Sequence, residues 1–222
     1  MFERPVTRRD SLIRLGGFAV TALGLGGLEA ARADAATVSC ILTPEQTEGP
    51  YYIAGEKLRR NITEGRPGAP LVLRTFVVDA SSCRPIPNAA VDIWHADASG
   101  IYSGFGDGVS SRTFMRGIQR TNARGLAQFR TVYPGWYQGR TVHVHVKVHV
   151  SGNVVHTGQL YFSDSMTDSV YRRAPYSARG SRDVRNASDS IYRSGGKRST
   201  VSVKKNSAGV CVATITMGVR RT

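Results

Sequence analysis

Two histidines, separated by one valine, lie in a stretch of the chain where valine and other residues strictly alternate. Valines occupy every second position of residues 141–150, which predicts a β-strand with His143 and His145 on the face opposite the valines. Imidazoles two positions apart on one strand can bind a single metal ion at adjacent coordination positions. The alternative is that this polar face, which also carries Lys147 and His149, meets water.

Two tyrosines lie upstream of this strand, one at a turn and one after another alternating segment. Tyr137 follows the tight turn predicted at Pro134-Gly135, and Tyr102 follows the alternating segment at residues 90–95. Phenolate oxygens neutralise a hard, highly charged ion such as Fe(III), whereas two imidazoles alone would also suit copper. The combination favours ferric iron over a copper site built on the two histidines.

The elements that must hold these residues are short strands separated by turns. Strands at roughly ten-residue spacing without long helices favour an all-β fold, an antiparallel β-sandwich with long loops. Residues 56–70 and 175–198 carry little strand signal and are predicted to be surface loops. The pattern predicts one short helix at residues 164–171 and strands at residues 71–78, 90–95, 126–132, 141–150, 153–162, 200–204 and 210–219.

The composition is that of a folded globular protein. Of the 222 residues, 41% are hydrophobic and 21% are charged, which disfavours a disordered chain. No apolar run is long enough to span a bilayer, so no integral membrane segment is predicted after signal removal. The net charge of +14 is scattered along the chain, with few aromatic residues beside its densest basic stretch. A nucleic-acid partner is therefore not expected.

Residues 1–33 are predicted to be an export signal that precedes one folded domain at 34–222. Arg8 and Arg9 precede an apolar stretch at residues 15–28, and the tripeptide at 31–33 offers a small-residue cleavage site. This pattern is similar to the twin-arginine signals of exported bacterial proteins and predicts a periplasmic or extracellular location. An amphipathic surface helix is the alternative, which the five glycines of this stretch disfavour.

The three cysteines are Cys40, Cys83 and Cys211, and they allow one disulfide in three possible pairings. An exported protein can keep such a bond because its compartment is oxidising. Their spacing leaves the pairing open.

Four motifs carry a family resemblance. The string WHADASGIYS contains Tyr102, and YQGRTVHVH runs from Tyr137 to His145. TPEQTEGPYY occupies residues 43–52, and GQLYF occupies residues 158–162. Over about residues 43–162 the chain resembles the intradiol ring-cleavage dioxygenases, in particular their short, exported, single-domain branch. These enzymes use non-haem Fe(III) to open catechols between the two hydroxyl-bearing carbons.

The resemblance implies a site and a reaction. It implies that Arg140 stabilises charge that develops on the ring and that Tyr137 leaves the iron and takes a proton from the substrate. The implied reaction inserts both atoms of O2 into a small catechol-type substrate and yields a muconate-type diacid. The implied ligands of non-haem Fe(III) are Tyr102, Tyr137, His143 and His145, and the implied substrate-pocket residues are Pro50, Tyr51 and Gln159.

The chain also departs from its relatives. Ala96 stands where many exported relatives have a cysteine, so Cys83 cannot form a disulfide with that position. His95, which the family does not use for iron, is predicted to be buried and hydrogen-bonded. The helical dimerisation segment of larger relatives is not expected here, and no oligomeric state is predicted. The alternative of another class is a secreted β-sandwich module that binds a ligand without catalysis.

Overall fold

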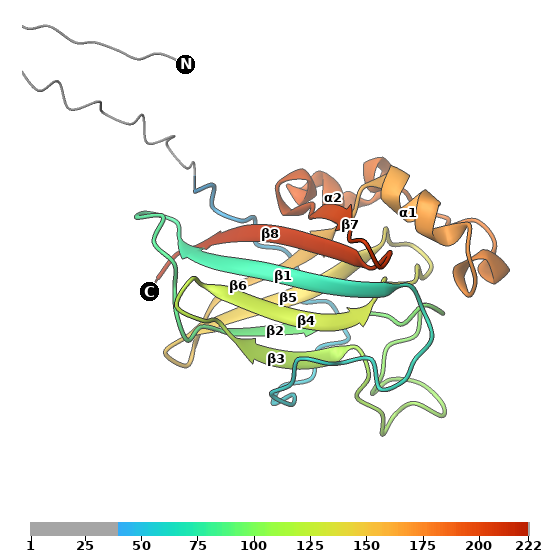
Figure 1. The fold of residues 1–222 in the computed structure, drawn as a ribbon, viewed down its shortest axis with the longest axis horizontal. Coiled ribbons are helices and arrows are strands. Elements are labelled where there is room, and N and C mark those ends of the chain that lie inside the picture. The colour runs from blue at the N-terminus through green and yellow to red at the C-terminus, as the bar shows by residue number, and fades with distance from the viewer. Residues whose placement is uncertain (1–39, 222) are drawn as a thin grey trace, which may run out of the picture. The chain divides into compact units, whose positions relative to one another are not determined.

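The computed structural model describes residues 40–221 of the chain (Figure 1). The predicted export signal and its boundary with the domain lie outside the described residues. The strands are β1 (Pro70–Asp79), β2 (Ala90–Trp94), β3 (Arg116–Arg120), β4 (Leu126–Val132), β5 (His143–Val150), β6 (Asn153–Tyr161), β7 (Ser202–Lys205) and β8 (Cys211–Val219). The helices are α1 (Asp164–Tyr171) and α2 (Ser190–Arg193), with short 3₁₀ helices at Tyr176–Arg179, Asn186–Ser188 and Gly196–Ser199.

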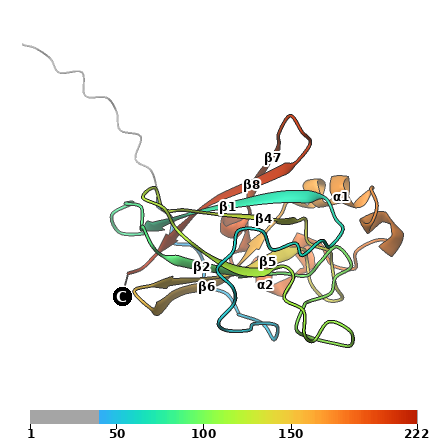
Figure 2. The ribbon, with the colours of Figure 1, turned by 60° about the horizontal axis from the view of Figure 1, so that its bottom comes forward.

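These strands form two four-stranded sheets that lie in two layers (Figure 2). Sheet A has the order β4-β1-β8-β7, and sheet B has the order β3-β2-β5-β6. The predicted β-sandwich is confirmed. In sheet A, β1 and β8 run parallel, with Leu71 opposite Cys211, so the antiparallel prediction does not hold for this pair. Parallel neighbours need a long connection between them, and most of the chain lies between these two strands.

Alternating residues of both sheets fill the space between the layers. From β5, Val144, Val146 and Val148 are fully buried and share one apolar core with Leu73 and Phe129 of sheet A. Burial of each such side chain contributes about 1.5–3 kcal/mol to the driving force for folding. Because neighbouring residues of a strand point to opposite faces, this core places the histidines of β5 on the outer face of sheet B.

A segment of the chain crosses that outer face, and we call residues 44–57 the covering segment. At one end, Gln46 N donates to Thr157 O of β6 at 3.0 Å. At the other end, Ile118 N of β3 donates to Lys57 O at 2.9 Å. The covering segment therefore spans sheet B from one edge strand to the other.

The covering segment removes the outer face of β5 from water. Lys147 pairs with Glu48, and its ammonium group lies 3.8 Å from the centre of the Tyr52 ring. His143, His145 and Lys147 are 3%, 1% and 8% exposed. The alternative of a strand whose polar face meets water is therefore wrong for these three residues.

The predicted strands lie within two residues of their observed bounds, but β3 was not predicted. Its sequence, RGIQR, holds one large apolar residue, and as an edge strand it needs less burial than a central one. Helix α1 matches the prediction, with Ser163 as the N-cap whose hydroxyl accepts from Met166 N at 3.2 Å. The loop predicted at residues 175–198 is not irregular throughout, since it includes α2 and short 3₁₀ helices.

The structure resolves the cysteine pairing. Cys40 and Cys83 form a disulfide that closes 43 residues of chain, and Cys211 is a free thiol in the core. The bond ties the residues just before the covering segment to the connection between β1 and β2.

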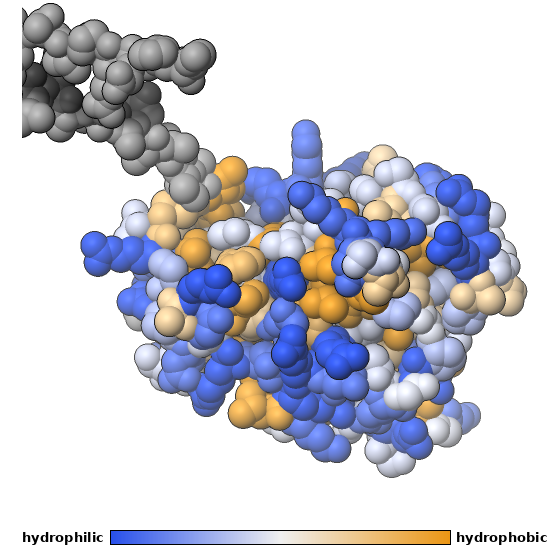
Figure 3. All heavy atoms as spheres, viewed as in Figure 1, coloured by the Kyte–Doolittle hydropathy of each residue, from blue (hydrophilic) through white to orange (hydrophobic). Residues whose placement is uncertain are grey.

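Over sheet A, the surface carries hydrophilic residues spread around a smaller apolar area (Figure 3). Within residues 40–221, no helix combines the length and the apolar character needed to cross a membrane.

Candidate metal centre

His143 and His145 lie at the end of sheet B where β2 and β6 finish. In antiparallel register, His145 is opposite Trp94, and His143 is opposite Tyr161. The Nε2 atoms of the two histidines are 3.1 Å apart. The Nδ1 atom of His143 lies 2.6 Å from the carbonyl oxygen of Thr141, so Nδ1 carries the proton and donates, which leaves a lone pair on Nε2. The two imidazoles thus direct ring nitrogens to one point.

Tyr137 reaches the same point from the turn before β5. Its hydroxyl oxygen lies 3.2 Å from His143 Nε2. A β-bridge between Tyr137 and Arg140 closes the turn. Tyr137 is half-buried, and it is the most accessible of the four predicted ligands.

Tyr102 approaches the two histidines and Tyr137 from the loop after β2. The Asp97 carboxylate shapes this loop, because its Oδ1 atom accepts from Ser99 N at 2.8 Å and from Ile101 N at 3.1 Å. Tyr102 is 5% exposed, and its ring centre lies 5.6 Å from that of Tyr137 and 6.1 Å from that of His145. All four predicted ligands therefore come together.

The two tyrosine loops are bonded to each other. Gly135 N donates to Asp97 O at 2.9 Å, and Arg179 Nη1 bridges the loops by donating to Trp136 O at 2.6 Å and to Ala98 O at 3.5 Å. A Cβ atom at position 135 would lie 2.4 Å from Ala98 O, so only glycine permits this approach. Each loop is therefore positioned by the other.

Aromatic stacking orients two of the rings. Trp94 lies parallel to His145 with ring centres 5.0 Å apart, and Tyr51 stacks on Tyr102 with ring centres 4.3 Å apart. Stacked aromatic pairs are worth about 0.5–1.5 kcal/mol beyond their buried area. The predicted substrate-pocket residue Tyr51 is thus in contact with a predicted ligand.

Burial keeps both imidazoles of the site neutral. The pKa of His143 falls to about 3, first because of burial and then because of the nearby Arg140 cation. The pKa of His145 falls well below its usual value, mainly through burial and then through His143. Neutral imidazoles keep the lone pairs that metal coordination needs.

The same burial opposes ionisation of the two phenols. It raises the pKa of Tyr102 well above its usual value and also raises the pKa of Tyr137, whereas Arg140 acts in the opposite direction on both. A bound trivalent cation would supply the positive charge that two phenolates require and would reverse these shifts. Two neutral nitrogen donors and two ionisable oxygen donors around one point fit a ferric ion.

In the part of the chain that the structure describes, no group of three or more His, Cys, Asp or Glu side chains is arranged to hold a metal ion. The phenols of Tyr137 and Tyr102 are the oxygen donors that the structure brings beside the two histidines. This donor set favours ferric iron over a copper site built on His143 and His145 alone.

Arg140 and Gln159 meet beside the phenols. Arg140 Nη2 donates to Gln159 Oε1 at 2.6 Å, and Gln159 Nε2 donates to Thr47 O of the covering segment at 3.0 Å. Gln159 is 1% exposed, and both ends of its amide are bonded within the protein. Its contact with a substrate stays a prediction, as does that of Pro50, which is exposed on the covering segment.

His95 is fully buried, as expected from the sequence. Its Nδ1 atom lies 2.8 Å from Ala96 O, and its Nε2 atom lies 2.8 Å from Thr131 Oγ1. Both ring nitrogens are therefore engaged away from the metal centre, which confirms the prediction of a hydrogen-bonded histidine.

Sequence reasoning missed two carboxylates that organise the site. Asp97 lies within the WHADASGIYS string, and its Asp-x-Ser-Gly spacing is a turn signal that could have revealed it. Asp189, which bonds Arg140, is 49 residues away in the sequence and carries no signal of that contact.

The family model, the solved structures and the enzymes to which this chain is similar are all described as dioxygenases. Residues 47–170 match the family model described as Dioxygenase. An intradiol ring-cleavage dioxygenase from Tetranychus urticae is 37% identical, with a TM-score of 0.78 over 82% of this chain and 95% of that one. The dioxygenase domain of a dioxygenase–carbohydrate-binding protein fusion from Streptomyces sp. SirexAA-E is 29% identical, with a TM-score of 0.64 over 82% of this chain and 100% of that one.

Similarity to longer enzymes is more local. Catechol 1,2-dioxygenase 1 of Acinetobacter lwoffii is 34% identical over 101 residues, which are 43% of this chain and 32% of that enzyme. The chain thus spans about a third of the length of the catechol 1,2-dioxygenases it matches. The family model, in contrast, covers more than half of this chain and includes all four predicted ligands. The chain therefore belongs to the intradiol ring-cleavage dioxygenase family.

Proposed function

We propose that this protein is a non-haem Fe(III) intradiol dioxygenase that cleaves a catechol-type ring between its two hydroxyl-bearing carbons. The observation that carries the proposal is the convergence of two phenols and two imidazoles from three separate segments. When bound there, ferric iron would supply the Lewis acidity that binds both catechol oxygens and makes the ring reactive toward O2. Both atoms of O2 would enter the product, a muconate-type diacid.

Tyr137 is the predicted ligand that a substrate oxygen could most easily replace. It is the most accessible of the four predicted ligands, whereas the other three are almost fully buried. A catechol must lose two protons to bind through both oxygens, and the phenolate oxygen of Tyr137 would accept one of them while hydroxide accepts the other.

Arg140 supplies fixed positive charge beside this place. Its guanidinium group is close enough to act on the pKa values of Tyr102 and Tyr137. A cation held in a partly buried position stabilises negative charge on a bound ring without reorganisation. Arg140 would therefore stabilise the electron-rich ring as the reaction proceeds.

Three measurements test the proposal. Purified iron-loaded protein should absorb visible light through phenolate-to-iron charge transfer, and Tyr137→Phe should weaken or shift that band. With catechol and isotopically labelled O2, the protein should release a diacid that carries both labelled atoms. A colourless, folded protein that binds catechol without consuming O2 would contradict the proposal and support the binding module instead.

We also propose that residues 1–33 direct export. The paired arginines support this, and the Cys40–Cys83 disulfide is of a kind that persists in oxidising compartments outside the cytoplasm. Replacing Arg8 and Arg9 together by lysine should leave the protein in the cytoplasmic fraction, whereas Arg4→Lys should not. Equal export of both variants would contradict a twin-arginine signal.

A further inference from the structure

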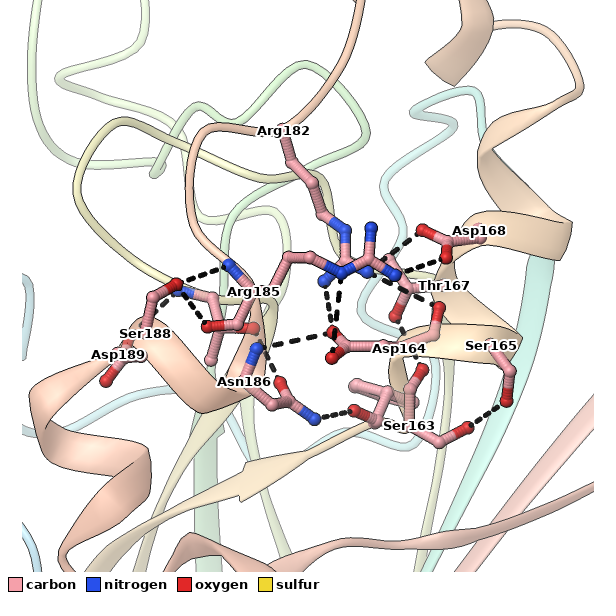
Figure 4. Close-up of polar contacts among 12 residues, drawn as sticks. Ser163, Asp164, Ser165, Thr167, Asp168, Arg182, Arg185, Asn186, Ser188 and Asp189 are labelled. Atoms are coloured by element: carbon pink, nitrogen blue, oxygen red, sulfur yellow. Dashed lines mark hydrogen bonds and ion pairs between the residues drawn. The ribbon is translucent and has the colours of Figure 1, made fainter.

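The segment that follows α1 is anchored to that helix by ion pairs around the buried guanidinium group of Arg182. Arg182 Nη1 lies 2.6 Å from Asp164 Oδ1, and its Nη2 lies 2.9 Å from Asp168 Oδ1 (Figure 4). Arg185 Nη2 lies 2.6 Å from Asp168 Oδ2. The Arg182 side chain is only 4% exposed, so this network is more than a set of surface ion pairs. It holds residues 182–189 in a defined place.

Asn186 links this anchored segment to the strand ends of sheet B. Its Nδ2 atom donates to Phe162 O at 2.8 Å, just after β6. Its Oδ1 atom accepts from Thr141 Oγ1 at 2.6 Å, just before β5. The segment therefore lies against the two strands that carry His143, His145 and Gln159.

Asp189 makes the next contact with the centre. Its Oδ2 atom accepts from Arg140 Nε and from Thr141 N, both at 2.8 Å. Its Oδ1 atom accepts from Ile191 N and Tyr192 N, which caps the first turn of α2. The residue is 2% exposed. The Oδ1 atom thus caps α2, and the Oδ2 atom binds Arg140 and Thr141, which precede β5.

Arg140 and Thr141, the two partners of Asp189 Oδ2, are themselves bonded to groups of the site. Thr141 O accepts from His143 Nδ1 at 2.6 Å and so sets the direction of that imidazole. Arg140 donates through Nε to Asp189 and through Nη2 to Gln159, so its guanidinium plane is held along two edges.

We propose that Asp189 is a positioning residue, which aims the Arg140 guanidinium at the substrate and, through Thr141, fixes the imidazole of His143. The inference rests on the proposed function, because it assigns Asp189 to the same site. The segment after α1 would then orient groups that act in the reaction, in addition to closing the surface of the domain.

The competing explanation is that Asp189 only caps α2. The two oxygens separate these roles. In Asp189→Asn, the amide oxygen can still cap α2, since asparagine is as good an N-cap as aspartate. The amide NH2 group would then face Arg140 Nε and Thr141 N, which are donors and cannot accept from it. Asp189→Ser likewise keeps a capping oxygen but is too short to serve both places.

We expect Asp189→Asn to lower kcat about 10- to 100-fold with a smaller change in KM, as for loss of an outer partner of a metal-site residue. The charge-transfer band of the iron-loaded protein should shift. A crystal structure of the metal-free variant should show the Arg140 guanidinium rotated away from its position between Asp189 and Gln159.

Asp168→Asn is the matched control. It makes the same change from carboxylate to amide and loosens the same segment, but Asp168 contacts Arg182 and Arg185 instead of Arg140. We expect its kcat to stay within about twofold of wild type, because the Asp168 carboxylate is partly exposed. Equal losses of kcat in both variants, or an unchanged band and Arg140 orientation in Asp189→Asn, would overturn the inference.

A double-mutant cycle tests whether Asp189 acts through Arg140. Once Arg140→Lys has removed the Nε donor, adding Asp189→Asn should cost much less than it does alone. Full additivity would contradict the inference. Failure of the proposed function gives a different result, namely a wild type without oxygenase activity, and the metal-free structures would still show whether Asp189 orients Arg140.

Discussion

His143 and His145 bring their Nε2 atoms to within 3.1 Å of each other while burial holds both rings neutral. Because Nδ1 of His143 keeps its proton and donates it in a hydrogen bond to Thr141 O, the Nε2 atom of that ring has a lone pair and no proton to donate. The Nε2 atom of His145 lies beside this lone pair, so the two rings bring nitrogens to one place.

Removal of one of these nitrogens should release the metal. For the proposed ferric centre, we expect His143→Ala to lose added Fe(III) on dialysis, because one neutral donor and its orienting bond to Thr141 are gone. Iron content per protein measures this. His149→Ala is the control, since His149 lies on the same strand outside the cluster, and it should keep its iron. Full iron occupancy in His143→Ala would contradict the assigned ligand.

Asp92 should make stability depend on pH in an unusual direction. It is 1% exposed beneath the covering segment, and neither carboxylate oxygen has a hydrogen-bond partner among the described residues. Burial raises its pKa from 3.8 to about 7, with Tyr52 and Lys147 acting against the shift and Glu56 adding to it. The folded protein therefore keeps a proton that the unfolded chain loses, so stability falls as pH rises from about 4 to about 7.

Asp92→Asn should abolish the fall in stability that ionisation of Asp92 causes as the pH rises. At about pH 8 we expect the variant to gain up to about 4 kcal/mol in free energy of unfolding over wild type, and the gain should vanish near pH 4. Denaturant unfolding across this pH range measures the difference. Asp79→Asn should show the opposite sign, because hydrogen bonds from Ser81 and Ser82 lower the pKa of Asp79 to about 2. A pH-independent difference for Asp92→Asn would contradict the assignment.

The disulfide should contribute strongly to stability. It closes a loop of 43 residues, and we expect Cys83→Ser to lower the free energy of unfolding by roughly 2–5 kcal/mol. Denaturant unfolding with and without reductant measures this effect. Cys211→Ser should respond to reductant as wild type does, since Cys211 takes no part in the bond. A reductant effect that disappears in Cys211→Ser would contradict the pairing.

Gly135 should be required for the two tyrosine loops to meet. A Cβ atom there would lie 2.4 Å from Ala98 O and 2.5 Å from Asp97 O, and backbone atoms cannot yield cheaply. We expect Gly135→Ala to lower the free energy of unfolding by about 1–3 kcal/mol and to weaken the charge-transfer band. Thermal unfolding and visible absorption measure the two effects.

Gly139→Ala is the control for this prediction. A Cβ atom at position 139 would meet nothing within 4 Å, although the φ of +81° makes alanine unfavourable there. This variant should lose stability through strain and keep its band. Equal weakening of the band in both variants would show that contact between the loops does not hold the phenols.

Local sequence patterns predicted seven of the eight strands in the described part of the chain and the short helix α1, whereas β3 carried no such pattern. Alternation of valine and polar residues predicts β5 because the two faces of a strand repeat every second residue, and this period needs no knowledge of the rest of the fold. The motifs around Tyr102 and Tyr137 are likewise short, since each ligand depends on one local turn.

Contacts between distant segments appear only in the folded protein. The parallel pairing of β1 with β8, the Cys40–Cys83 bond and the carboxylate of Asp189 beside Arg140 each join residues that are far apart in the sequence. Such contacts depend on which surfaces become buried together when the layers pack, and no local spacing records that outcome. The family resemblance implied the four predicted ligands, but the convergence of their side chains depends on the packed layers around them.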